Sequence, residues 1–260
     1  MITRDFPRLL IAAPHSSAGK TTFTLGLLLA LRQAGWCVQP FKVGPDFIDP
    51  SHHTALCARA SRNLDTWMCE NAVVQEIFTR AAAGAQLSVI EGVMGLFDGY
   101  GPHEERGSTA HVAKLLQVPV ILVIDAQRMA TSAAAVALGF EQFDRDVRIA
   151  GVVFNRVGSE GHYAWLKNAV EARTGLRSFG YLGFDPGLEL EERHLGLVTA
   201  TEHAPDSGWM RSLKRHFDEH IDLEGLIATA RAAQPLNIGT TGIFDARADE
   251  PCVRIGVARD

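Results

Sequence analysis

Residues 9–22 read LLIAAPHSSAGKTT, an apolar run followed by a small-residue loop that ends in Gly-Lys-Thr-Thr. The run predicts a buried strand and the residues from Lys20 onward predict a helix, so the loop leads into a helix N-terminus. We expect the backbone N–H groups there to cradle a polyphosphate, with Lys20 reaching its terminal phosphates and the Thr21 hydroxyl ligating Mg²⁺. The strict G-x-x-x-x-G-K-[ST] pattern has glycine where this chain has Pro14, but the Gly-Lys-Thr core and its context are kept. The predicted phosphate-binding residues are His15, Ser16, Ser17, Ala18, Gly19, Lys20, Thr21 and Thr22.

The rest of the chain alternates short apolar runs with helical stretches, which is typical of parallel strands joined by helical crossovers. The predicted strands are Leu9–Ala13, Val38–Lys42, Leu87–Glu91, Val118–Asp125 and Ile149–Asn155, with a weaker sixth at Phe179–Leu182. The predicted helices are Lys20–Ala34, Ala72–Ala83, Thr109–Leu116, Ser132–Phe143 and His162–Arg173. We therefore predict a doubly wound α/β fold with a mostly parallel sheet, of the P-loop NTPase type.

The composition excludes several classes of protein. The chain has 260 residues, with 25 Lys and Arg against 30 Asp and Glu, and 47% of it is hydrophobic. This balance predicts no nucleic-acid partner, and the chain is too apolar to be disordered. The 4 cysteines form no C-x-x-C pair, so we expect neither a disulfide framework nor a structural metal, in agreement with a reducing cytoplasm. No apolar run approaches the roughly 20 residues needed to cross a bilayer, so we expect no membrane partner.

A cluster of charged residues follows the second predicted strand, in the segment KVGPDFIDP from Lys42 to Pro50. Its two prolines and glycine predict an extended loop. Asp46 and Asp49 would stand at the C-terminal end of the strand, where carboxylates suit magnesium ligation or substrate orientation. Two simpler interpretations stay open, in which Asp49 is a turn or helix-capping residue and Lys42 is a solvated strand end.

A second acidic cluster, EGVMGLFDG from Glu91 to Gly99, follows the third predicted strand. An acid at the end of the strand beside a phosphate loop is where a Walker B carboxylate orders the metal shell, so Glu91 is a candidate for that role. The three glycines of the segment permit a close approach to phosphates or substrate, or mark an ordinary β-turn. Asp98 is a further candidate at the end of the segment.

Two more polar residues follow predicted strands, Asp125 after the fourth and Asn155 after the fifth. Open α/β sheets bind ligands at this edge, so either residue could touch the nucleotide base. His52 and His53 adjoin the aspartate loop, but no third ligand has a recognisable spacing. We interpret them as loop packing or substrate contacts and not as metal ligands.

The C-terminal part of the chain predicts a change of domain. Residues 234–252 lose periodicity and collect prolines and glycines, which is typical of a linker, and residues 253–260 read VRIGVARD, a fresh strand pattern. We expect an α/β domain over residues 1–233 and the first strand of a further domain at 253–260. The alternative is that this last strand joins the edge of the main sheet.

Four segments together resemble one enzyme family. They are the phosphate loop, FKVGPDFIDP from Phe41 to Pro50, SRNLDTWM from Ser61 to Met68, and IEGVMGLFDG from Ile90 to Gly99. The pattern is similar to that of the cobyrinic acid and hydrogenobyrinic acid a,c-diamide synthases. The resemblance implies a dethiobiotin-synthetase-like ATP-binding domain that amidates the a and c acetate carboxylates of a corrinoid in cobalamin biosynthesis. It also implies that residues 253–260 begin a class I glutamine amidotransferase-like domain, which would supply ammonia from glutamine.

The resemblance assigns roles to matching residues. It implies that Lys20 and Thr21 hold ATP and Mg²⁺, and that Asp46 and Glu91 complete the metal environment. It implies that Lys42, Asp49 and Asp98 orient the substrate carboxylate, the intermediate or ammonia. Without the glutaminase domain the chain would use free ammonium. A homodimer stays open.

One position departs from the family pattern, because Ser17 stands where members usually have glycine. If that position needs a positive φ, serine costs about 1 kcal/mol, and nucleotide affinity falls.

Two rival functions stay open. One is a partner-controlled ATPase switch of the partitioning or septum-positioning type, which usually carries an extra lysine early in the phosphate loop, where this chain has His15 and Ser16. The other is a nickel-sirohydrochlorin a,c-diamide synthase, which performs the same chemistry on another tetrapyrrole.

Overall fold

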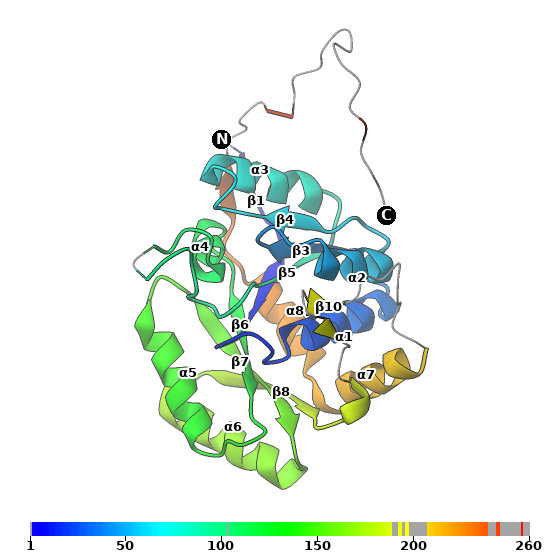
Figure 1. Ribbon diagram of the computed structural model, residues 1–260, viewed down its shortest axis with the longest axis vertical. Coiled ribbons are helices and arrows are strands. Elements are labelled where there is room, and N and C mark those ends of the chain that lie inside the picture. Colours follow the sequence, from blue (N-terminus) through cyan, green and yellow to red (C-terminus); the bar gives the residue numbers. More distant parts are fainter. Residues whose placement is uncertain are drawn as a thin grey trace.

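A seven-stranded parallel sheet runs through the middle of the computed structural model, in the order β4-β3-β5-β2-β6-β7-β8 (Figure 1). The structure describes residues 2–102, 104–188, 192–193, 196–197, 207–238, 243–244 and 256. The strands of the sheet are β2 (Arg8–Ala12), β3 (Val38–Val43), β4 (Arg62–Leu64), β5 (Leu87–Glu91), β6 (Val120–Asp125), β7 (Ile149–Val157) and β8 (Arg177–Gly183).

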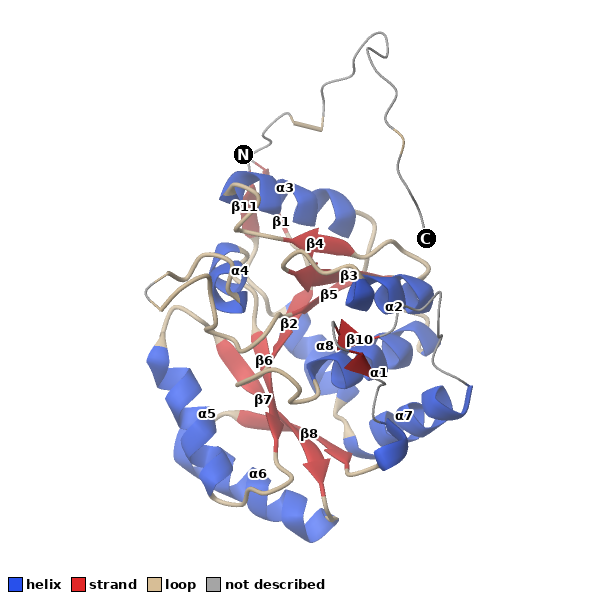
Figure 2. Cartoon of the chain, in the orientation of Figure 1, coloured by secondary structure: helices blue, strands red, loops and turns tan. Residues whose placement is uncertain are grey.

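Helices cover both faces of this sheet, so the strands lie between two helical layers (Figure 2). One layer contains α3 (Asn71–Ala82), α4 (Thr109–Leu115), α5 (Ser132–Phe143) and α6 (Glu160–Thr174). The other contains α1 (Lys20–Gln33), α2 (Ile48–Cys57), α7 (Ser207–His220) and α8 (Leu223–Arg231). The predicted doubly wound α/β fold is confirmed.

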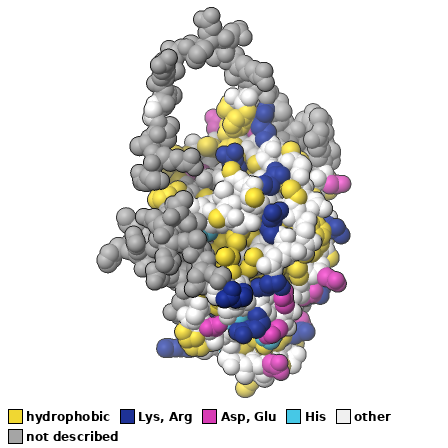
Figure 3. Space-filling model, turned by 90° about the vertical axis from the view of Figure 1, so that its right-hand side faces the viewer, with side chains coloured by type: hydrophobic (Ala, Val, Ile, Leu, Met, Phe, Trp, Pro, Cys, Tyr) yellow, Lys and Arg dark blue, Asp and Glu magenta, His cyan; other side chains and the backbone are white. Residues whose placement is uncertain are grey.

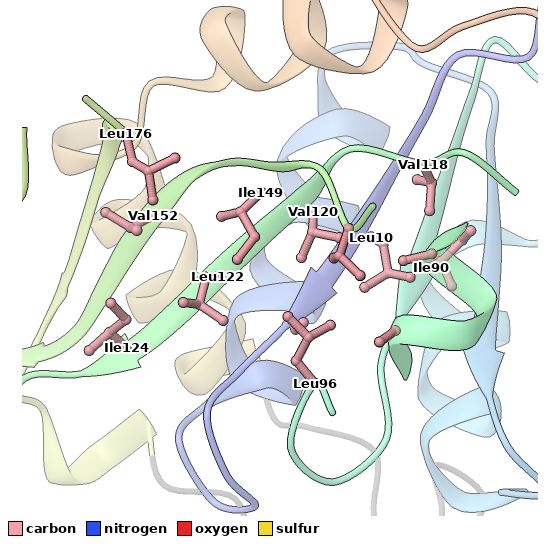
Figure 4. Close-up of a cluster of buried hydrophobic side chains, with 14 of the residues drawn as sticks. Leu10, Ile90, Leu96, Val118, Val120, Leu122, Ile124, Ile149, Val152 and Leu176 are labelled. Carbon is pink, nitrogen blue, oxygen red and sulfur yellow. The ribbon is translucent and has the colours of Figure 1, made fainter. Parts of the chain in front are cut away.

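The two cores on either side of the sheet follow from the period of two along each strand. On β2, Leu10 and Ala12 belong to one buried cluster, whereas Leu9 and Ile11 belong to the other. Figure 4 shows part of the first cluster, in which the labelled side chains come from β2, β5, β6 and β7 and from the segments that connect the elements. A strand that is buried on both faces has no polar alternation, which is why its sequence reads as a continuous apolar run.

The structure confirms all six predicted strands and all five predicted helices, with ends shifted by a few residues. The sequence analysis missed β4, α2, α7 and α8. The predicted extended loop between Lys42 and Pro50 was partly wrong, because α2 already begins at Ile48. Pro50 stands in the first turn of α2, where its missing N–H has no intrahelical partner to lose.

The predicted linker at residues 234–252 begins in ordered structure. Strand β11 (Leu236–Ile238) pairs antiparallel with β1 (Ile2–Arg4) and forms a separate two-stranded sheet. The buried Arg8 side chain supports this attachment, because its Nη2 donates to the carbonyl of Gln234 at 2.7 Å while its Nε donates to that of Leu116 at 2.8 Å. The strand predicted at residues 253–260 lies outside the described residues, apart from Gly256.

Three short elements complete the described fold. The 3₁₀ helix η1 (Pro186–Leu188) follows β8, and strands β9 (Glu192–Arg193) and β10 (Gly196–Leu197) pair antiparallel with each other. Among the described helices, none is both long and apolar enough to cross a membrane. Figure 3 shows one face of the molecule, on which basic, acidic and hydrophobic side chains are interspersed.

Replacing a side chain at the centre of the sheet tests the two-sided core. Leu122 on β6 is fully buried, so Leu122→Ala should lower the free energy of unfolding by about 2–5 kcal/mol through lost burial and a residual cavity. Leu138→Ala on α5 removes a leucine that is 40% exposed, and should change it by less than about 0.5 kcal/mol. Urea unfolding followed by circular dichroism measures both, and equal losses would contradict the layered core.

Candidate functional site

A cavity of about 890 Å³ lies at the C-terminal edge of the parallel strands. Open α/β sheets bind their ligands at this edge, because the loops that leave the strands diverge there to opposite faces. The cavity is lined by Ser16, Ser17, Gly19, Lys20, Thr21, Thr22, Lys42, Pro45, Asp46, Phe47, Ile48, Asp49, Val93, Met94, Asn155, Arg156, Leu182, Gly183, Phe184, Asp185 and Leu188. The phosphate loop and the aspartate loop, predicted from separate motifs, therefore open into one cavity.

The phosphate loop has the left-handed backbone that such a loop needs. Ser17 has a φ of 60° and Gly19 a φ of 100°. Position 17 therefore has the positive φ at which serine is less favourable than glycine. A Cβ atom at position 19 would lie 2.0 Å from Nδ2 of Asn155, so only glycine fits. Asn155 Nδ2 in turn donates to the carbonyl of Ala18 at 3.0 Å. The Asn155 side chain thus packs against Gly19 and holds the phosphate loop in place through this hydrogen bond.

Lys20 begins helix α1 and points its ammonium group across the loop. Its Nζ donates to the carbonyl of Met94 at 2.6 Å and to that of His15 at 3.2 Å. Burial lowers the pKa of Lys20 to about 8, although the nearby carboxylate of Glu91 opposes this shift. The Lys20 ammonium group therefore donates to two neutral backbone carbonyls, and charged phosphate oxygens would be stronger acceptors for it.

A second lysine, Lys42, lies buried between two carboxylates. Its Nζ donates to Oε1 of Glu91 at 2.9 Å, to the carboxylate of Asp49, and to the carbonyl of Gly92 at 3.1 Å. Oδ2 of Asp46 lies 3.9 Å from the same nitrogen. The alternative interpretation of Lys42 as a solvated strand end is wrong, because its side chain is 4% exposed.

Glu91 joins this cluster to the phosphate loop. Its side chain is fully buried, its Oε1 also accepts from the Thr21 hydroxyl at 2.6 Å, and its Oε2 lies 2.8 Å from Nε2 of His53. His53 is also fully buried, and it lies four positions after Asp49, so both side chains lie on the same face of α2. Sequence analysis treated His53 as loop packing or a substrate contact, because it missed the helix that gives this spacing its meaning.

The two carboxyl groups that contact Lys42 have pKa values shifted in opposite directions. Burial would raise the pKa of Glu91, but Lys42 and the hydrogen bond with His53 hold it below its usual range. Burial raises the pKa of Asp49, and the charge of Glu91 raises it further. Burial alone would lower the pKa of Lys42, yet both acids together raise it. Glu91 is therefore the permanently charged partner, and Asp49 is the carboxyl that exchanges a proton more readily.

The other two predicted acids, Asp46 and Asp98, accept hydrogen bonds from backbone N–H groups. Oδ1 of Asp46 accepts from the N–H groups of Ile48 at 2.7 Å and Asp49 at 3.4 Å, so it caps the start of α2 while it also lines the cavity. Oδ2 of Asp98 accepts from the N–H of Gly95 at 2.8 Å and shapes the loop after β5. Four of the predicted site residues are not in the cavity lining: His15, Ala18, Glu91 and Asp98.

Arg156 is a cavity residue that the sequence analysis missed. It has a φ of 57°, and its Nη1 donates to Oδ2 of Asp125 at 2.6 Å and to the carbonyl of Ser17 at 3.1 Å. Asp125 is thus an ion-pair partner of Arg156 and lies outside the cavity lining, and its contact with a nucleotide base stays a prediction. The available signal for Arg156 was its position after Asn155 at a strand end.

The oxygen donors at the site fit a magnesium ion that arrives with a nucleotide. Within the described ranges, no group of three or more His, Cys, Asp and Glu side chains is arranged to hold a metal by itself. Mg²⁺ commonly takes only one or two protein oxygens and completes its shell with phosphates and water. The Thr21 hydroxyl and the Glu91 carboxylate, which lie together at the end of the phosphate loop, match that requirement.

A comparison with known protein families agrees with this geometry. The family model described as CobQ/CobB/MinD/ParA nucleotide binding domain matches residues 9–198. Among solved structures, chloroplast FtsY from Physcomitrella patens aligns with a TM-score of 0.47 at 16% identity, over 82% of this chain and 66% of that chain.

Curated relatives cover almost the whole chain. Cobyrinate a,c-diamide synthase from Priestia megaterium is 44% identical over 97% of this chain and 54% of its own length. The enzymes of the same name from Listeria innocua and Methanosarcina acetivorans are 42% and 40% identical, over 97% and 98% of this chain. They are covered over 56% and 54% of their own lengths, so the chain spans about half the length of these relatives. With its phosphate loop, parallel sheet and cavity in place, the chain belongs to the CobQ/CobB/MinD/ParA family of nucleotide-binding domains.

Proposed function

We propose that this chain is the ATP-binding domain of an amide-forming ligase that acts on the a and c acetate carboxylates of cobyrinic or hydrogenobyrinic acid. The observation that carries the proposal is a single cavity that combines two sets of functional residues. Its lining includes Lys20 and Thr21 of the phosphate loop as well as Lys42 and Asp49. Curated relatives at 40–44% identity are named cobyrinate a,c-diamide synthase, and this supports the tetrapyrrole substrate.

The proposed reaction takes place between ATP and the substrate carboxylate, which would both bind in this cavity. An acetate oxygen attacks the γ-phosphorus of ATP, a new P–O bond forms, the bond to the bridging oxygen breaks, and ADP leaves with that electron pair. Ammonia then attacks the acyl carbon, and phosphate leaves as the C–N bond forms and the nitrogen loses a proton. Each step requires the reacting groups to be held in line while negative charge is neutralised.

The residues divide this work by position. Lys20 would neutralise the terminal phosphates, and the N-terminus of α1 would bind them through backbone N–H groups. Lys42 would orient the incoming carboxylate, because it is a second lysine in the lining of the same cavity. Asp49, whose pKa burial and Glu91 raise, would take the proton that the attacking nitrogen releases. Asp98 would act indirectly by ordering the loop that contains Met94.

Magnesium would be held by Thr21 and Glu91, with Asp46 nearby, and would supply charge neutralisation to the phosphates. The remaining assignments are also proposals. Residues 1–233 would form the synthetase domain, residues 234–252 would lead away from it, and residues 253–260 would begin a glutaminase-type domain that supplies ammonia. A cytoplasmic location, a homodimer and a weaker ATP affinity caused by Ser17 belong to the same proposal.

Incubation of the chain with ATP, Mg²⁺, ammonium and cobyrinic or hydrogenobyrinic acid tests this function directly. We expect mass spectrometry to show conversion of two acids to amides. A parallel reaction with nickel-sirohydrochlorin tests the other tetrapyrrole. ATP-dependent dimerisation without any amide product would instead favour the ATPase switch.

The acidity of Lys20 predicts a pH dependence for nucleotide binding. Free Lys20 has a pKa of about 8, and bound phosphates should raise it, so binding takes up a proton above pH 8. We expect the affinity for Mg-ATP to be about tenfold lower at pH 9 than at pH 7. Calorimetry in two buffers with different heats of ionisation measures the proton uptake directly. Lys20→Arg stays charged and should bind without this uptake, and an unchanged uptake would contradict the assignment.

The buried cluster predicts a non-additive pair of substitutions. Lys42→Met leaves Glu91 and Asp49 without their cation and should lower the free energy of unfolding by about 3–5 kcal/mol. Glu91→Gln in the Lys42→Met background removes one of the stranded charges and should recover part of this loss. Urea unfolding of both single variants and the double variant measures the coupling. Strict additivity would show that the two side chains do not depend on each other.

A further inference from the structure

The motif SRNLDTWM from Ser61 to Met68 has no role in the chemistry described above, and it ends in an exposed aromatic surface. The rings of Trp67 and Tyr100 stack with centroids 3.8 Å apart and planes 16° from parallel. Trp67 is 45% exposed and Tyr100 is 69% exposed. The two stacked rings leave apolar surface exposed to water, so this pair is a candidate binding surface.

Several hydrogen bonds fix the pair in place. Oδ1 of Asp65 accepts from the N–H groups of Trp67 at 2.8 Å and Met68 at 3.1 Å, which locks the turn after β4. Arg106 lies 5.4 Å above the Trp67 ring, and its Nη2 donates to the Trp67 carbonyl at 3.2 Å. The N–H of Tyr100 donates to the carbonyl of Arg106 at 3.2 Å. The surface is therefore already formed before any ligand arrives, which reduces the entropy lost on binding.

The pair lies at the same sheet edge as the reaction site. Trp67 follows β4 and Tyr100 follows the loop after β5, and these two strands flank β3, which ends next to Lys42. Asn63 donates to the carbonyls of Gly44 and Asp46, and four residues reach at most about 14 Å, so Trp67 lies within that span of Asn63. Trp67 and Tyr100 are not among the residues that line the cavity, so a ligand on the rings would reach Lys42 only through an extended arm.

The chemistry of the surface specifies its ligand. A tetrapyrrole macrocycle is broad enough to pack against the exposed Tyr100 ring, and its carboxylate arms suit the neighbouring Arg106 guanidinium. We infer that Trp67 and Tyr100 form the resting surface for the macrocycle of the tetrapyrrole substrate, and orient one acetate arm toward Lys42. This inference rests on the proposed function and adds a substrate-binding site to it.

Binding of cobyrinic acid to the chain in the absence of ATP tests the surface. Equilibrium dialysis followed by absorbance should give a dissociation constant about tenfold higher for Tyr100→Ala and for Trp67→Ala than for the unchanged chain. In the amidation assay with ammonium, the KM for cobyrinic acid should rise by a similar factor while the KM for ATP stays the same. Trp165→Ala is the matched control, because Trp165 is 61% exposed on α6 and lies outside this surface.

The outcomes separate this inference from the proposed function. If the unchanged chain neither binds nor amidates any tetrapyrrole, the proposed function fails. If it does both, and the two aromatic variants match it while thermal melting shows that they are folded, the surface assignment is wrong. Sedimentation in which the aromatic variants lose only self-association would also overturn the assignment, because the rings would then bind a second copy of the chain.

Discussion

Burial of the Lys42 ammonium between Glu91 and Asp49 is the constraint on which the site depends. A charged group removed from water costs several kcal/mol unless a partner of opposite charge and hydrogen bonds compensate it. The partners come from three elements, since Lys42 belongs to β3, Glu91 to β5 and Asp49 to α2. The pairing therefore fixes how β3 and β5 end and where α2 begins.

The Glu91 carboxylate contacts residues from both functional segments of the site. Glu91 accepts from Thr21 at the start of α1 and contacts His53 on α2, so the phosphate loop and the aspartate loop share one buried anchor. A shift of α2 would move Asp49 and His53, which contact Lys42 and Glu91, and Glu91 connects these contacts to Thr21 of the phosphate loop. Such shared anchoring suits a two-substrate reaction, because a phosphate and a carboxylate have to meet with their distance already set.

Sequence patterns gave reliable information where one local rule decided the outcome. Apolar runs identified six strands of the main sheet, because burial on both faces leaves no polar alternation. The Gly-Lys-Thr core identified the phosphate loop, even with Pro14 in place of glycine. Local rules failed at α2, where Pro45 and Pro50 suggested an extended loop although Pro50 is compatible with a first helical turn. Missing that helix hid the relation between Asp49 and His53.

The sequence by itself determined the fold class, the phosphate loop and the set of charged residues at strand ends, because these follow from periodicity and from short motifs. Only the tertiary structure decided what each charged residue contacts. Asp46 caps a helix, Asp125 pairs with Arg156, and Asn155 supports Gly19, although all three occupy similar strand-end positions in the sequence. Partners from distant segments make this choice, since hydrogen bonds and ion pairs depend on distances that the chain sets only when the sheet has assembled.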